Sequence, residues 1–214
     1  MTTATTQTIT PPVSLPFRPP SFLPQPNEQP FTPPPSSVLL GTWSLLHTSN
    51  PYWSDKRNVT FSYSLPSTPS KPPNPISQAS SLDPTPQPTY TVRASYQPLA
   101  SPTLKTMLGH DTPLPSPGSF RWRGAGWLRL ATARWEILGH GKEGGTEWMV
   151  SFVEGNLFSA AAVNVLVRDV EGGGKGGRDG GREEVLEAVL EALRGVLEGP
   201  GEMGGAVRDV VWDL

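Results

Sequence analysis

The chain has 214 residues, no cysteine and a formal net charge of −2 at pH 7. Its length allows one domain of ordinary size together with additional segments at the ends. The slightly acidic balance excludes nucleic-acid binding led by phosphate contacts. The lack of cysteine excludes disulfides, thiolate metal sites and a cysteine nucleophile.

Proline-rich and glycine-rich segments flank and interrupt the part of the chain that is able to fold. Residues 1–36 are mostly Thr, Pro and Ser, so they bury too little apolar surface to offset their chain entropy. We expect a disordered tail there, one domain over residues 37–214, and a disordered proline-rich insertion over residues 66–88. Residues 171–181 are glycine-rich and predict a flexible linker. Residues 182–198 carry apolar side chains at three- and four-residue spacing, which predicts an amphipathic helix.

The hydroxyl-rich N-terminal segment is free of acidic residues up to Glu28, which leaves a transit peptide open, although Arg18 is its only basic residue. The N-terminal segment has no basic region followed by an apolar core, so we expect no secretory signal. No apolar run approaches the ~20 residues that a membrane helix needs. Together with the absence of cysteine, these features favour a cytoplasmic protein without a membrane span.

The middle of the chain consists of short segments in which apolar and polar residues alternate, the period of a half-buried strand. About eight such segments follow one another at near-regular spacing, which favours an antiparallel sandwich or an up-and-down barrel. A short apolar segment near the C-terminus, residues 207–212, is expected to cover a sheet edge. The expected strands are residues 38–47, 57–65, 89–99, 104–112, 120–141 (two or three strands), 146–154 and 158–168.

A Gly-x-Trp pattern opens the first strand at Gly41 and Trp43, and Arg168 ends the last one. In a closed barrel the first and last strands are neighbours, so a guanidinium can cover the indole face where the barrel base must be closed. With eight strands and a trailing helix, this arrangement resembles the lipocalins of the calycin superfamily. The resemblance implies an all-β fold with a C-terminal helix, built as an eight-stranded antiparallel up-and-down barrel.

Two further segments are similar to a family of fungal lipocalin-like proteins of unassigned role. One is WxDKRNV, represented by Trp53 and by Asp55 to Val59, and the other is RGxGWL, from Arg123 to Leu128. The proline-rich insertion at residues 66–88 is not a feature of that family. The resemblance implies a barrel interior that holds one small apolar molecule.

Aromatic residues supply the expected ligand contacts. The loop after the first strand should overhang the barrel mouth as a lid that carries Trp53. The other candidate ligand-binding residues sit in mid-strand, where about half of the side chains face inward. These are Tyr63, Tyr96, Trp122, Trp135 and Trp148.

Three functions remain open at this stage. The first is a carrier of a small hydrophobic molecule. The second is an isomerase or cyclase without a cofactor, in which His47, Asp55 or Lys56 would transfer protons or stabilise charge. The third is a scaffold whose proline-rich segments bind partner proteins.

We expect no metal site and no bound cofactor. The three histidines, His47, His110 and His140, show no metal-ligand spacing. The glycine runs lack the spacing of a phosphate-binding loop, and the pattern of a serine hydrolase is absent.

Overall fold

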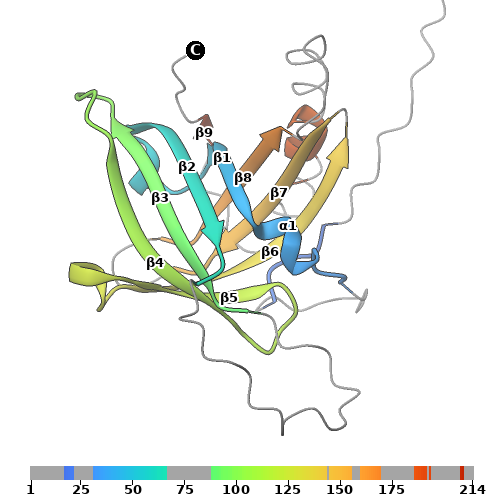
Figure 1. The fold of residues 1–214 in the computed structure, drawn as a ribbon. Helices are drawn as coiled ribbons and strands as arrows, with labels where there is room; N and C mark the ends of the chain where they lie inside the picture. Colours follow the sequence, from blue (N-terminus) through green and yellow to red (C-terminus); the bar gives the residue numbers. More distant parts are fainter. Residues whose placement is uncertain are drawn as a thin grey trace, which may run out of the picture.

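The computed structural model describes residues 17–21, 31–66, 88–143, 145–155, 160–169, 186–191, 193 and 208–209. Within these residues, eight antiparallel strands form a closed barrel (Figure 1). Each strand pairs with the next along the chain, and β1 closes the ring by pairing with both β2 and β8. The predicted eight-stranded up-and-down barrel is therefore confirmed.

The strands lie close to their predicted positions. A two-residue strand, β9, pairs with the end of β1, within the segment expected to cover an edge. The strands are β1 (Gly41–Thr48), β2 (Lys56–Ser64), β3 (Tyr90–Pro98), β4 (Lys105–Pro113), β5 (Ser119–Gly124), β6 (Thr132–Glu143), β7 (Thr146–Val153), β8 (Ala162–Asp169) and β9 (Arg208–Asp209).

The connections between strands divide the barrel into two ends. The β1–β2, β3–β4, β5–β6 and β7–β8 connections lie at one end, which we call the mouth. The other end, the base, holds the β2–β3, β4–β5 and β6–β7 connections and the short helix α1 (Ser36–Leu39). The insertion predicted over residues 66–88 leaves from the base, and residues 67–87 lie outside the described residues.

Two predicted strand segments form helical turns instead. The first strand was expected from residue 38, but α1 ends at Leu39 and β1 begins at Gly41, whose φ of 102° turns the chain. Leu39 is buried, so its apolar character reflects base packing. The strand expected to continue through Trp127 is interrupted by a 3-10 turn, η2 (Gly126–Leu128).

Side chains of the barrel divide into two buried clusters. The inner cluster fills the inside of the barrel and includes Trp43, Tyr63 and Trp135. The outer cluster lies on the opposite face of β6, β7 and β8, where Leu186, Val189 and Leu193 pack on the sheet. Residues 186–191 and 193 are helical, so the predicted helix packed outside the barrel is confirmed for these positions.

Part of the segment expected to be disordered packs on the barrel wall. The backbone N–H of Arg18 donates to the Leu138 carbonyl at 2.8 Å, and its guanidinium forms an ion pair with Glu136 at 3.1 Å. The Phe17 ring lies 5.5 Å from the Trp148 ring. Within the tail expected to be disordered, Phe17 and Arg18 therefore contact the barrel wall, and residues 1–16 and 22–30 lie outside the described residues.

Candidate ligand-binding site

Trp43 and Arg168 close the base of the barrel. Trp43 is fully buried, and the Arg168 guanidinium carbon lies 4.3 Å from the centre of its ring. The guanidinium also donates to the Leu40 carbonyl and pairs with the Glu147 carboxylate. A Cβ on Gly41 would lie 3.3 Å from an Arg168 nitrogen, so the glycine leaves room for this plug. The contact expected between the first and last strands is present, and it fixes which end is closed.

Above the base, the inner wall is aromatic. The Phe120 and Trp135 rings stack at 4.6 Å, and Tyr63 packs 6.3 Å from Trp135. Tyr90 contacts Phe120 edge-on at 6.1 Å. Side chains at alternate positions of a strand share a face, so neighbouring strands present these rings to the same interior. The four rings are buried against one another, so this wall is a closely packed apolar layer.

Above the base, one carboxylic acid among the described residues interrupts this wall. Asp111 faces inward from β4 and is 1% exposed, and the Trp135 indole N–H donates to its Oδ1 at 2.8 Å. Burial raises the pKa of Asp111 to about 7, against the smaller, lowering effect of the Trp135 hydrogen bond. Among the described residues, no Lys or Arg forms an ion pair with it. Near neutral pH, both the acid and the carboxylate are therefore populated.

Some inward-facing apolar side chains are only partly buried. Trp122 and Met107 face inward, as their pairing with Asp111 and Ala94 shows, yet both are only partly buried. Phe61 and Val153 share this property and also pack on the inner cluster. Apolar side chains that point into a closed barrel and still contact solvent mark where an apolar ligand would displace water.

An aromatic lid covers the mouth. The 3-10 turn η1 (Pro51–Trp53) places Trp53 between Phe61 and Tyr96, with ring distances of 5.5 and 5.8 Å. The Lys56 ammonium lies 3.9 Å from the Tyr52 ring centre and 5.5 Å from that of Tyr96. The predicted lid thus carries one predicted ligand-binding residue, Trp53, and contacts another, Tyr96.

Polar contacts hold the lid in place. Lys56 pairs with Asp55 at 2.6 Å and also donates to the Tyr52 carbonyl. The hydrogen bond from Lys56 lowers the pKa of Asp55. Burial, followed by the hydrogen bond with Tyr96, raises the pKa of Tyr52 above its usual range. The two charged catalytic candidates therefore pair with each other within the lid.

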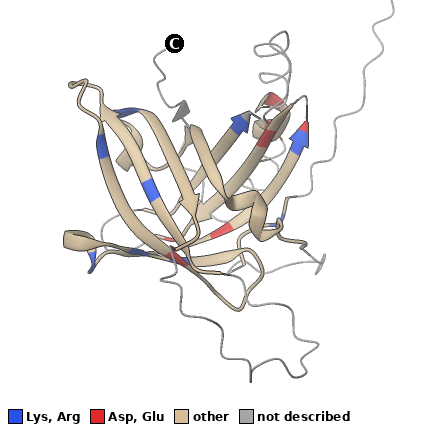
Figure 2. Ribbon diagram, in the orientation of Figure 1, with Lys and Arg blue, Asp and Glu red and all other residues tan. Residues whose placement is uncertain are grey.

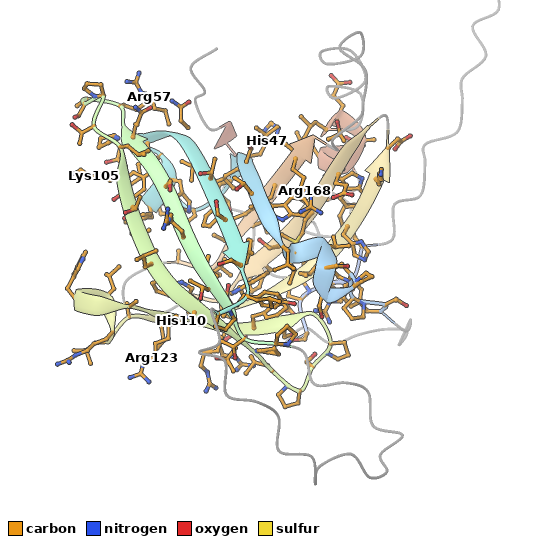
Figure 3. All side chains as sticks on the ribbon, in the orientation of Figure 1. His47, Arg57, Lys105, His110, Arg123 and Arg168 are labelled. Atoms are coloured by element: carbon orange, nitrogen blue, oxygen red, sulfur yellow. The ribbon has the colours of Figure 1, made fainter. Side chains whose placement is uncertain are left out.

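Two sequence candidates lie outside the interior. His47 pairs with Val165 on β8, and Val165 belongs to the outer cluster, so His47 faces outward. Trp148 packs in the same outer cluster, where Phe17 covers it. The proposed catalytic set is thus separated by the barrel wall. Figure 3 shows His47 on the strand β1.

Sequence reasoning missed Asp111, Phe120 and Tyr90. Asp111 alternates with Gly109 and Met107 on β4, so its position in the alternation was the available signal. An acidic residue at such a position is read as solvent-facing unless the strand register is known. Among the described residues, no group of three or more His, Asp or Glu side chains is placed to hold a metal ion. Nor does any described helix have the length and apolar character needed to cross a membrane.

Comparison with solved structures supports the fold. The cockroach allergen Per a 4 is 11% identical over 86% of this chain and 91% of its own, with a TM-score of 0.50. Apocrustacyanin C1 is 12% identical over 82% of this chain and 78% of its own, with a TM-score of 0.47. The siderocalin Ex-FABP is 11% identical over 82% of this chain and 95% of its own, with a TM-score of 0.45.

No family model matches the chain. No curated protein matches it either. At 11% identity, the likeness to the allergen concerns the fold alone. The architecture, an eight-stranded closed antiparallel barrel with a short C-terminal helix, is consistent with the lipocalin fold.

Proposed function

We propose that this protein binds a small, mostly apolar molecule inside the barrel and that Asp111 accepts a hydrogen bond from a hydroxyl or amine on it. The observation that carries the proposal is the aromatic inner wall, interrupted by one buried acid. An apolar interior with few polar groups is the usual construction of a small-molecule site, in which the polar groups fix the orientation of the ligand. The resemblance to the lipocalins, a sequence-based prediction, points the same way.

The lid supports this proposal because it is aromatic on its inner side. Trp53 is 6% exposed and packs on Tyr96 and Phe61 at the mouth. A ligand that enters from the mouth must displace this turn or pass beside it. The lid is a short turn and not a paired strand, and such segments open at a lower free-energy cost than barrel strands.

The enzymatic alternative has less support. His47 faces away from the interior, whereas Asp55 and Lys56 pair with each other in the lid. The scaffold alternative concerns proline-rich segments, most of which lie outside the described residues. Residues 17–21 and 31–36 contact the barrel itself, so we favour the carrier.

Two fluorescent probes of the same shape test the proposal. 1-Aminoanthracene carries an N–H donor and anthracene does not, and we expect saturable binding of both to the full chain. Asp111→Ala should weaken 1-aminoanthracene by about tenfold and leave anthracene nearly unchanged, since a hydrogen bond to a charged group contributes about 1.5–3 kcal/mol. Thr112→Ala is the matched control, because Thr112 is next to Asp111 on β4 and is exposed.

A second variant tests the location of the probe. Ala133 pairs with Trp122 on the inner face and is only partly buried, so a larger side chain there extends into the interior. Ala133→Phe should weaken both probes alike. Absence of saturable binding, or unchanged binding of both probes to Ala133→Phe, would contradict the proposal.

A further inference from the structure

The connection between β5 and β6 exposes its largest apolar side chains. Trp127 is 87% exposed and Leu130 is 86% exposed, the highest values among the exposed large hydrophobic residues. We call these two residues the apolar tip. Figure 1 shows the connection extending away from the barrel near the end of β5. Large apolar side chains that contact so little of their own protein are typical of an interaction site.

The apolar tip is held in a defined turn. The Leu128 N–H donates to the Ala125 carbonyl at 3.2 Å, and the Ala131 N–H donates to the Leu128 carbonyl at 2.8 Å. The Ala125 N–H donates to the Leu108 carbonyl on β4, also at 2.8 Å. Gly124 allows Leu128 to pack against the backbone, since a Cβ there would lie 2.4 Å from the Leu128 carbonyl oxygen. The chain therefore presents Trp127 and Leu130 from an ordered loop.

Positive charge surrounds the apolar tip. Between residues 90 and 135 the chain has six basic residues and one acidic residue, the buried Asp111, although its overall net charge is −2. Four of these basic residues are exposed on β3, on β5 and in the loop, and we call them the basic face. They are Arg93, Arg121, Arg123 and Arg129. Figure 2 shows basic residues along this side of the barrel.

One residue of the basic face belongs to a pair of like charges that lowers the stability of the sheet when no anion is bound. Arg121 lies directly opposite Arg134 on the neighbouring strand. Like charges at directly opposite positions destabilise a sheet. Among the described residues near the mouth, the surface carboxylates Asp55 and Glu154 already pair with Lys56 and Arg134. The charge of the basic face is therefore available to an anionic partner.

The same end of the molecule holds most of the other exposed apolar side chains. Figure 3 shows Arg57, Lys105 and Arg123 on the mouth side of the barrel, away from Arg168 at the base. Of the seven large hydrophobic residues that are exposed in the described part of the chain, six belong to the mouth or to the adjoining part of β4. These are Tyr52, Leu99, Leu104, Leu108, Trp127 and Leu130, whereas Leu65 lies at the base.

We propose that the apolar tip and the basic face dock the mouth of the barrel onto the surface of an anionic lipid bilayer. Trp is favoured at the membrane–water interface, because its ring is apolar while its N–H stays hydrated. Each cation near an anionic leaflet adds to the attraction. A pair of side chains on a projecting turn suits insertion between lipid headgroups, whereas a stable protein interface needs a broader and flatter contact area. This docking is independent of which molecule the interior binds.

Vesicle sedimentation of the full chain tests this surface. We expect the protein to bind vesicles that contain phosphatidylserine, to bind phosphatidylcholine vesicles much more weakly, and to be released as salt is raised. Trp127→Ser should reduce binding by about tenfold or more, since burial of a large apolar side chain is lost. Arg129→Gln should reduce it by about fivefold on the anionic vesicles only.

Matched control variants distinguish docking through this surface from non-specific binding to vesicles. Leu65→Ser removes a half-exposed leucine at the base, and Lys142→Gln removes an exposed cation from the β6–β7 hairpin. Both should bind the anionic vesicles as the unmodified chain does, and circular dichroism should show that every variant is folded. The proposal is overturned if the unmodified chain binds no vesicle or if Leu65→Ser weakens binding as much as Trp127→Ser. Self-association through Trp127, or binding of an oligonucleotide, without any vesicle binding would also overturn it.

Discussion

Replacing Asp111 with asparagine should make the protein more stable at neutral and alkaline pH. The substitution removes the ionisable group but keeps an oxygen at the position that accepts the Trp135 N–H hydrogen bond. The inner acid has a pKa of about 7 when folded, compared with an ordinary value of 3.8. This difference is equivalent to about 4 kcal/mol when the carboxylate is fully ionised.

The direction of the pH effect follows from proton binding. Because the folded state holds the Asp111 proton more tightly, it binds more protons than the unfolded chain between these two pKa values. The stability due to this group is greatest at acidic pH, falls as the pH rises above about 4 and levels off above about pH 7. Tyr63, which lies nearby, has its pKa raised by burial and by the Asp111 charge, so it stays protonated across this range.

Urea unfolding of both proteins at pH 5 and pH 8 measures the effect. The free energy of unfolding of the unmodified chain, relative to Asp111→Asn, should fall by about 3 kcal/mol between these conditions. Taking the difference between the two proteins cancels the titration of distant groups. Thr112→Asn on the exposed side of β4 should follow the unmodified chain. Equal pH dependence in Asp111→Asn and the unmodified chain would refute the reasoning, because it would mean that Asp111 titrates normally.

Two further predictions concern the barrel frame. Trp43→Ala should lower the free energy of unfolding by about 4 kcal/mol, because it empties the base and leaves Arg168 without its aromatic cover. Trp127→Ala should change the free energy of unfolding by less than about 0.5 kcal/mol. If urea unfolding shows similar losses for Trp43→Ala and Trp127→Ala, then Trp43 does not close the base of the barrel. Asn58→Val should cost about 1–2 kcal/mol in thermal unfolding, since Asn58 has a φ of 53° in the bulge of β2, where a branched side chain is strained. Asn58→Gly should lose much less, and equal losses in the two variants would show that the Gln97 hydrogen bond, not the backbone, matters there.

The sequence by itself predicted about eight antiparallel strands and the side-chain contact that closes the barrel. Alternation in β3 placed Tyr90, Val92, Ala94 and Tyr96 on one face, and all four are buried. The prediction was correct because one face of β3 is buried and the other contacts solvent, so apolar and polar residues alternate along the strand. The contact between Trp43 and Arg168 was also anticipated, because closing a ring makes its first and last members neighbours.

Only the tertiary structure decided which faces point inward where both faces of a strand are buried. On β7, Trp148 faces the outer cluster while Met149 faces the interior, and both are nearly inaccessible to solvent. The helix and Phe17 cover the outside of this strand, so both of its faces are apolar. The pattern of apolar and polar residues therefore does not show which face points into the barrel. The inward placement of Asp111 likewise depends on its pairing with Tyr90 and Trp122. Register is set by contacts between distant segments, and no local pattern encodes it.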